Sequence, residues 1–163
     1  QKRGLHYKGF LFVGLMKVGD EPFVIEFNAR LGDPETQTIL NRIEGDLVPA
    51  LLSVRDQTLD QHPIHVKDMA VATIVLCAEH YPDTPAKGDA IEISESAANG
   101  KIYIAGAVQK DGILVTSGGR VASCTGMGAR PEEALSEAYS LVEAVRFRGM
   151  QYRRDVGKDV WEN

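Results

Sequence analysis

The sequence predicts an α+β protein built from two units. Residues 24–30 alternate between apolar side chains at 25, 27 and 29 and polar ones at 26, 28 and 30, which is typical of a half-buried strand. Residues 69–78 form a long apolar run, followed by several short strand-like segments. From Pro131 onward, apolar side chains recur with helical spacing. We therefore expect a first unit over residues 1–60, and a small β-rich unit with a covering helix over residues 61–163.

The composition restricts the class of protein. The chain has 163 residues, 44% of them hydrophobic, which is enough to form a core. A net charge of −5 argues against general electrostatic binding of nucleic acid or acidic membranes. No apolar run approaches the ~20 residues that span a bilayer. Cys77 and Cys124 lie apart in apolar segments, so we expect reduced thiols and a cytoplasmic location.

The first unit is predicted to open with an antiparallel hairpin. Its strands cover residues 7–16 and 22–30, and the turn covers residues 18–21. In the second strand one face is apolar and is expected to point into a core (Ile25, Phe27, Ala29). The other face is polar (Glu26, Asn28, Arg30).

The polar face of this strand has the chemistry of a metal and phosphate site. The Glu26 carboxylate and the Asn28 amide are hard oxygen ligands of the kind that Mg²⁺ binds together with substrate phosphates. The planar guanidinium of Arg30 matches a phosphate or a carboxylate. The simpler alternative is a surface strand with ordinary polar residues.

Two helices are predicted to follow the hairpin. Gly32 allows the chain to turn, Asp33 has the side chain of an N-cap, and Pro34 suits the first helical position. The first helix should run from Pro34 to about Arg42, with its free N–H groups directed toward an anion. Asp46 should cap a second helix over residues 47–54.

The second unit is predicted to consist of strands and one helix. The apolar residues 69–78 should form a buried strand. Short strands are expected at residues 90–93, 101–108, 113–116 and 120–125. Turns are expected at Asn99-Gly100 and Asp111-Gly112. A helix beginning at Pro131 and reaching residue 145 should cover one face of the sheet.

Several motifs resemble one enzyme family. The run Arg30-Leu31-Gly32-Asp33-Pro34-Glu35-Thr36-Gln37, which follows Glu26-Phe27-Asn28, closely resembles the signature of the phosphoribosylamine–glycine ligases. These enzymes are also called glycinamide ribonucleotide synthetases and belong to the ATP-grasp superfamily. Residues 7–16 resemble the strand just upstream of that signature, and residues 116–121 and 146–157 resemble the family's C-terminal domain.

The resemblance implies an activity and a set of site residues. It implies an ATP-dependent ligase of purine biosynthesis that joins glycine to 5-phosphoribosylamine. Mg²⁺ or Mn²⁺ would be bound by Glu26 and Asn28. Arg30 would be the catalytic residue, holding the phosphates of ATP or of glycyl phosphate. Gly32, Asp33 and Pro34 would line the glycine or product site.

The resemblance also implies a position within a longer enzyme. Residues 1–60 would be the C-terminal end of an ATP-grasp domain, and residues 61–163 would be the family's C-terminal domain. The N-terminal portion, which clamps ATP and binds phosphoribosylamine, would then be a partner, and this chain alone is expected to be inactive.

Other interpretations remain open from the residues alone. The chain could be a non-catalytic scaffold derived from an ATP-grasp fold, although a scaffold has no need of Glu26, Asn28 and Arg30 on one face. It could also be another ATP-grasp ligase of the purine pathway. Asp33 could serve only as an N-cap. Arg120 could contact a partner domain or a ribosyl phosphate, and the two glycines before it are more often a bulge than a ligand site.

Overall fold

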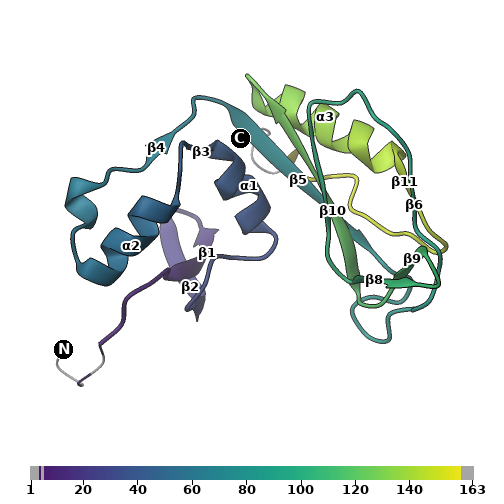
Figure 1. Cartoon of the computed structure of the whole chain (residues 1–163), viewed down its shortest axis with the longest axis horizontal. Coiled ribbons are helices and arrows are strands. Elements are labelled where there is room, and N and C mark those ends of the chain that lie inside the picture. The colour runs from purple at the N-terminus through teal and green to yellow at the C-terminus, as the bar shows by residue number, and fades with distance from the viewer. Residues whose placement is uncertain (1–3, 5, 159–163) are drawn as a thin grey trace.

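The computed structural model describes residues 4 and 6–158, and the elements form two lobes side by side (Figure 1). The N-terminal lobe holds the hairpin and the first two helices, and the C-terminal lobe holds a sheet with one long helix. Residues 1–3, 5 and 159–163, which the two expected units also include, lie outside the described residues. Mixed helix and strand agree with the α+β expectation. Among the described residues, no helix is both long and apolar enough to cross a membrane.

The described elements of the N-terminal lobe include the two predicted strands and the two predicted helices in the predicted order, with three short elements that were not predicted. They are β1 (Phe12–Val18), β2 (Glu21–Asn28), α1 (Glu35–Arg42), β3 (Ile43–Glu44), α2 (Val48–Asp56), the 3-10 helix η1 (Leu59–Gln61) and β4 (His65–Val66). β1 and β2 pair antiparallel, and β3 pairs with β4. The Asp46 carboxylate accepts a hydrogen bond of 2.9 Å from the Val48 backbone N–H, so it supports the start of α2 as expected.

The expectation that Ile25 and Phe27 point into a core is wrong for this chain. Ile25 is 62% exposed and Phe27 is 65% exposed. In the described part of the chain, β1 and β2 form a two-stranded ribbon that packs chiefly on itself. Such a ribbon has no layer against which to bury either face. The pairing also shifts register between Gly14 and Leu15.

The C-terminal lobe is built on a three-stranded antiparallel sheet with the order β5-β10-β7. Its strands are β5 (Ala70–Cys77), β10 (Arg120–Gly128) and β7 (Gly100–Ile104). Helix α3 (Pro131–Glu143) covers one face of this sheet, as predicted (Figure 1). The fully buried core between helix and sheet includes Ile74, Leu76, Val121, Ala138 and Val142.

Shorter strand pairs complete the C-terminal lobe. β6 (Glu92–Ile93) pairs with β11 (Val145–Arg146), and β8 (Ala107–Lys110) pairs with β9 (Ile113–Thr116). The expected strand at residues 101–108 is therefore divided into β7 and β8. Asp111 and Gly112 join β8 to β9 with φ angles of 50° and 81°, which confirms the predicted two-residue turn.

The second predicted turn, Asn99-Gly100, is wrong. Gly100 is the first residue of β7 and lies opposite Gly126 of β10. A Cβ atom at Gly100 would collide with the carbonyl oxygen of Thr125 and the Leu141 side chain. The Asn99 amide donates to the Met127 carbonyl at 3.0 Å. Glycine is needed here for close packing of backbones and not for a turn.

Helix α1 packs against β5, where Thr73 faces it, while the next residue, Ile74, lies in the core beneath α3. Since neighbouring residues of a strand point to opposite faces, the sheet lies between the two helices. The hydroxyl oxygens of Thr38 and Thr73 lie 2.9 Å apart, and those of Thr73 and Thr125 also lie 2.9 Å apart. The Asn41 amide donates to the Tyr103 hydroxyl at 2.8 Å. These side-chain contacts between the lobes are polar.

Candidate functional site

A cleft of about 460 Å³ lies beside the hairpin and gathers most of the residues singled out from the sequence. Glu26, Arg30, Gly32 and Asp33 line it, and Arg120 enters its wall from the C-terminal lobe. Pro34 lines a neighbouring cleft, and Asn28 lies outside the set of lining residues.

Glu26 and Asn28 share one face of the ribbon. Glu26 is paired with Gly14 and Asn28 with Phe12 across the antiparallel ladder. Residues two apart on a strand point to the same side. A Cβ atom at Gly14 would lie 3.1 Å from the Cγ of Glu26, so the glycine leaves room for the Glu26 side chain.

The side chain of Asn28 is suited to a cation. Its Nδ2 atom is buried and has no hydrogen-bond partner among the described residues. A half-turn of the amide would exchange Nδ2 for Oδ1, and the two atoms are distinguished only by their hydrogen bonds. The oxygen would then occupy this position and could bind a metal ion, with the Glu26 carboxylate on the same face as a second ligand.

Glu26 and Asn28 therefore fit Mg²⁺ or Mn²⁺ only as part of a larger ligand set. In the described part of the chain, no group of three His, Cys, Asp or Glu side chains could hold a metal ion. Mg²⁺ is commonly bound by one or two protein groups with water and substrate phosphates as the other ligands. The donor set agrees with that pattern.

Arg30 reaches the cleft from a bend, not from the strand. β2 ends at Asn28, two residues before it. The Arg30 guanidinium donates through Nη1 to the Leu31 carbonyl at 2.9 Å. The expectation that the strand extends through Arg30 is therefore wrong, but the side chain still lines the same cleft as Glu26.

Asp33 does not cap helix α1. The helix begins at Glu35, with Pro34 at the N-cap position and no side-chain cap. The Gly32 carbonyl instead accepts a hydrogen bond of 3.0 Å from the Thr36 N–H. The predicted start is therefore wrong by one residue.

Arg120 is the partner of Asp33, and the two residues join the lobes. Nη1 of Arg120 donates to the Asp33 carbonyl at 2.8 Å and lies 3.3 Å from the Asp33 carboxylate. The pattern around Arg120 leaves two alternative roles open, and neither of them involves Asp33. The two residues are 87 positions apart, and a pattern within either segment carries no signal for the pairing.

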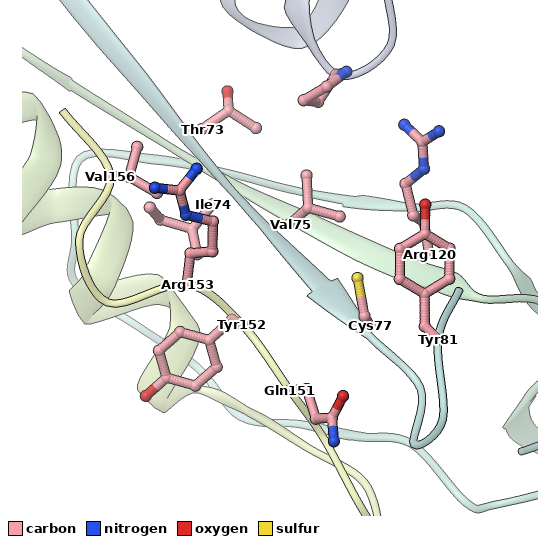
Figure 2. A pocket seen from close by; sticks show the side chains of 11 residues that line it. Thr73, Ile74, Val75, Cys77, Tyr81, Arg120, Gln151, Tyr152, Arg153 and Val156 are labelled. Atoms are coloured by element: carbon pink, nitrogen blue, oxygen red, sulfur yellow. The ribbon is translucent and has the colours of Figure 1, made fainter. Parts of the chain in front are cut away.

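Arg120 also borders a larger cleft of about 630 Å³ between Pro34, β5 and residues 151–156. Figure 2 shows Arg120 and Tyr81 beside each other at one end of this cleft and Arg153 at the other, with Cys77 between them. Burial raises the pKa of the Cys77 thiol, while the positive charge of Arg120 acts in the opposite direction. Because Arg120 lines both clefts, its contact with Asp33 lies where the two clefts adjoin.

Two family models match the chain. The model described as phosphoribosylglycinamide synthetase, C domain, matches residues 71–159. The model described as phosphoribosylglycinamide synthetase, ATP-grasp (A) domain, matches residues 1–36.

Curated relatives agree with these matches. The chain is 44% identical over 157 residues to the phosphoribosylamine–glycine ligase of Thermotoga maritima, covering 96% of this chain and 38% of that protein. It is 48% identical over 153 residues to the corresponding protein of Pasteurella multocida, covering 93% of this chain and 36% of that protein. The chain thus spans little more than a third of these relatives' length.

Solved structures show the same fold. The crystal structure of the Thermotoga maritima ligase matches with a TM-score of 0.82 at 43% identity, covering 94% of this chain and 38% of that chain. The urea carboxylase of Kluyveromyces lactis matches with a TM-score of 0.55 at 19% identity, covering 86% of this chain and 13% of that chain. The second match concerns the fold alone.

Proposed function

Since the chain belongs to the phosphoribosylglycinamide synthetase family, we propose that it forms part of a phosphoribosylamine–glycine ligase. This enzyme would consume ATP, glycine and 5-phosphoribosylamine and would form glycinamide ribonucleotide in purine biosynthesis. The observation that carries the proposal is the cleft in which Glu26, Arg30, Asp33 and Arg120 meet. Its donors match a metal-bound polyphosphate and a carboxylate.

Each lobe would correspond to one part of that enzyme. Residues 1–60 would be the C-terminal end of an ATP-grasp domain, and residues 61–163 would be the family's C-terminal domain. Support comes from the two family matches, which fall in different lobes, and from the separate core beneath α3. The urea carboxylase match agrees with a fold shared beyond the glycine ligases.

Each candidate site residue, in the cleft or beside it, would have a defined task. Glu26 and Asn28 would hold Mg²⁺ or Mn²⁺, which when bound offsets the negative charge of the ATP phosphates. Arg30 would act as the catalytic cation on the transferred phosphoryl group, because a guanidinium binds phosphate oxygens in pairs. Gly32, Asp33 and Pro34 would border the glycine or product site.

The reaction would proceed in two displacements. An oxygen of the glycine carboxylate bonds to the γ-phosphorus of ATP, and the bond from that phosphorus to ADP breaks. The amine of 5-phosphoribosylamine then attacks the carbonyl carbon of glycyl phosphate, loses a proton and expels inorganic phosphate. Positive groups fixed beside the transferred phosphoryl lower the barrier by stabilising the charge that develops there.

The test uses a chimaera in which this chain replaces the matching segment of the Thermotoga maritima ligase. We expect ADP release that requires both glycine and phosphoribosylamine. Glu26→Gln and Asn28→Ala should each raise the magnesium concentration needed for half-maximal rate, without a lower melting temperature. The loss of activity in the double variant should be far less than the sum of the losses in the two single variants, because the two residues act as a unit.

Glu21→Gln is the matched control, because Glu21 lies on the same strand, is exposed and lines neither cleft described above. A chimaera that folds but releases no ADP in response to glycine would refute the proposed function. If Glu26→Gln lowered the melting temperature sharply while its magnesium dependence stayed unchanged, Glu26 would be a structural residue.

A further inference from the structure

The position of Arg120 is set by an irregularity in the sheet. Arg120 is the first residue of β10 and lies opposite Cys77. The register of β10 against β5 shifts between Arg120 and Ala122, so Val121 is an additional residue. Bulges of this kind change the direction of a side chain at the end of a strand. Here the Arg120 side chain points away from the start of the central strand and contacts Asp33 of the other lobe.

Arg120 retains unused hydrogen-bond donors. Both of its contacts with Asp33 are made through Nη1. The Nε–H and the Nη2 amino group have no hydrogen-bond partner in the part of the chain that the structure describes, and the side chain is 40% exposed. A guanidinium has five N–H donors in one plane, so most of the N–H donors of Arg120 remain available to a ligand.

Asp33 shows which kind of group fits against Arg120. Its carboxylate lies 3.3 Å from Nη1, and its side chain is 57% exposed. An exposed ion pair of this kind contributes little to stability, because water screens the two charges. A second carboxylate offering two well-aligned oxygens would bind more strongly, since paired guanidinium–carboxylate hydrogen bonds are among the strongest polar contacts. Asp33 can therefore yield its place to a substrate carboxylate at little cost.

We propose that Arg120 is a substrate-binding residue which the C-terminal lobe contributes to the site, and that its ligand is the carboxylate of glycine. The inference rests on the proposed ligase function. Glu26 and Arg30 line the cleft on one side of the Asp33–Arg120 contact, and the cleft of about 630 Å³ lies on the other side. A carboxylate held at this contact is open to a phosphoryl donor from the first cleft and to an amine from the second.

This placement gives Arg120 a task in both displacements. One carboxylate oxygen bonds to the γ-phosphorus, and the other oxygen stays on the guanidinium. The second oxygen becomes the carbonyl oxygen of glycyl phosphate. When the amine adds to the carbonyl carbon, the π electron pair moves onto that oxygen, and Arg120 stabilises the resulting negative charge. The pair returns to the carbon as phosphate departs and the amine loses its proton.

The experiment uses the same chimaera with Arg120→Ala and Arg120→Lys. Arg130→Ala is the control, because Arg130 lies on the same lobe, is 74% exposed and, within residues 4 and 6–158, pairs only with the nearby Glu133, at 3.0 Å. For Arg120→Ala we expect turnover to fall about 10²-fold, as on removal of an oxyanion donor. The KM for glycine should rise at least about tenfold, since a charged hydrogen bond is lost. The KM for ATP should stay within about twofold, because Arg120 would not bind the nucleotide.

Two further readouts separate substrate binding from support of the fold. Added methylguanidinium should restore part of the activity of Arg120→Ala. Arg120→Lys should lose less turnover than Arg120→Ala, because it keeps the positive charge. If the KM values for glycine and ATP rose together, with a lower melting temperature and no rescue, Arg120 would only join the lobes and the inference would be overturned.

The remaining outcomes distinguish this inference from the proposed function. An active chimaera in which Arg120→Ala behaves like Arg130→Ala would overturn the inference alone. A folded, unsubstituted chimaera without glycine-dependent ADP release would overturn the proposed function, and the assignment of Arg120 would be overturned with it.

Discussion

The two thiols of the C-terminal sheet differ from an ordinary cysteine. Cys124 is completely buried, and burial raises its pKa from the usual 9.0 to about 12. Burial also raises the pKa of Cys77. In each case the thiolate, and not the thiol, is penalised by the loss of water. Both residues are free thiols, in agreement with the sequence-based expectation.

The thiol of Cys124 should make the protein sensitive to alkali. Between about pH 9 and pH 12 the unfolded chain loses the Cys124 proton while the folded chain keeps it. Its contribution to stability is therefore complete below pH 9 and is lost as pH rises, by up to about 1.4 kcal/mol per pH unit. Denaturant unfolding at several alkaline pH values measures how the free energy of unfolding changes with pH. For Cys124→Ala this free energy should fall less steeply with pH than it does for the unsubstituted protein. Equal slopes would contradict the assignment.

At the residue scale, local chemistry could be predicted but distant pairing could not. The alternation along β2 correctly predicts that Glu26 and Asn28 share a face, because period-2 geometry is local. The N-cap role of Asp33 is wrong, and its carboxylate lies 3.3 Å from the guanidinium of Arg120, which is 87 residues away. No pattern around Asp33 carries that information.

At the scale of elements, helix α3 and strand β10 approach so closely that only glycine fits between them. A Cβ atom at Gly126 would collide with the backbone nitrogen of Ala138 and the carbonyl oxygen of Ala134. Neither group can move without shifting the helix. The small side chains on this face of α3 and Gly126 of β10 together determine how closely the helix approaches the strand.

Gly126→Ala should therefore destabilise the protein by about 1–3 kcal/mol, as overpacking of a core does. Ser136→Ala on the exposed face of α3 is the control and should change stability by less than about 0.5 kcal/mol. Equilibrium unfolding in urea measures both changes. A Gly126→Ala variant as stable as the control would show that α3 can shift on the sheet.

The turns illustrate why the type of an element is easier to predict than the purpose of a residue. Asp111-Gly112 and Asn99-Gly100 have equivalent turn signals in the sequence. Only the first pair adopts the left-handed angles of a turn. Gly100 instead serves the approach of β7 to β10, which depends on residues far along the chain. The apolar run of β5 and the spacing of α3 are predicted well because hydrophobic burial determines both.

At the scale of the whole molecule, residues 62–163 should fold independently. The core between α3 and the sheet is formed within this segment, whereas β4 would lose its partner β3. The sheet face that contacts α1 carries hydroxyl groups, which water can solvate. The isolated segment should give a dispersed NMR spectrum. A collapsed spectrum from that segment, with a dispersed one from the full chain, would place the folding boundary elsewhere.

The hydroxyl contacts between α1 and the sheet have a consequence for calorimetry. The heat capacity of a transition reports mainly the apolar surface that it exposes to water. Thr38 and Asn41 of α1 meet the other lobe through polar groups, and Ile39 and Leu40 are 39% and 42% exposed, so we expect separation of α1 from the sheet to uncover little apolar surface. Separation of the lobes should therefore have a small heat capacity change and a free energy nearly linear in temperature. Unfolding of the sheet from α3, by contrast, should give a strongly curved stability profile.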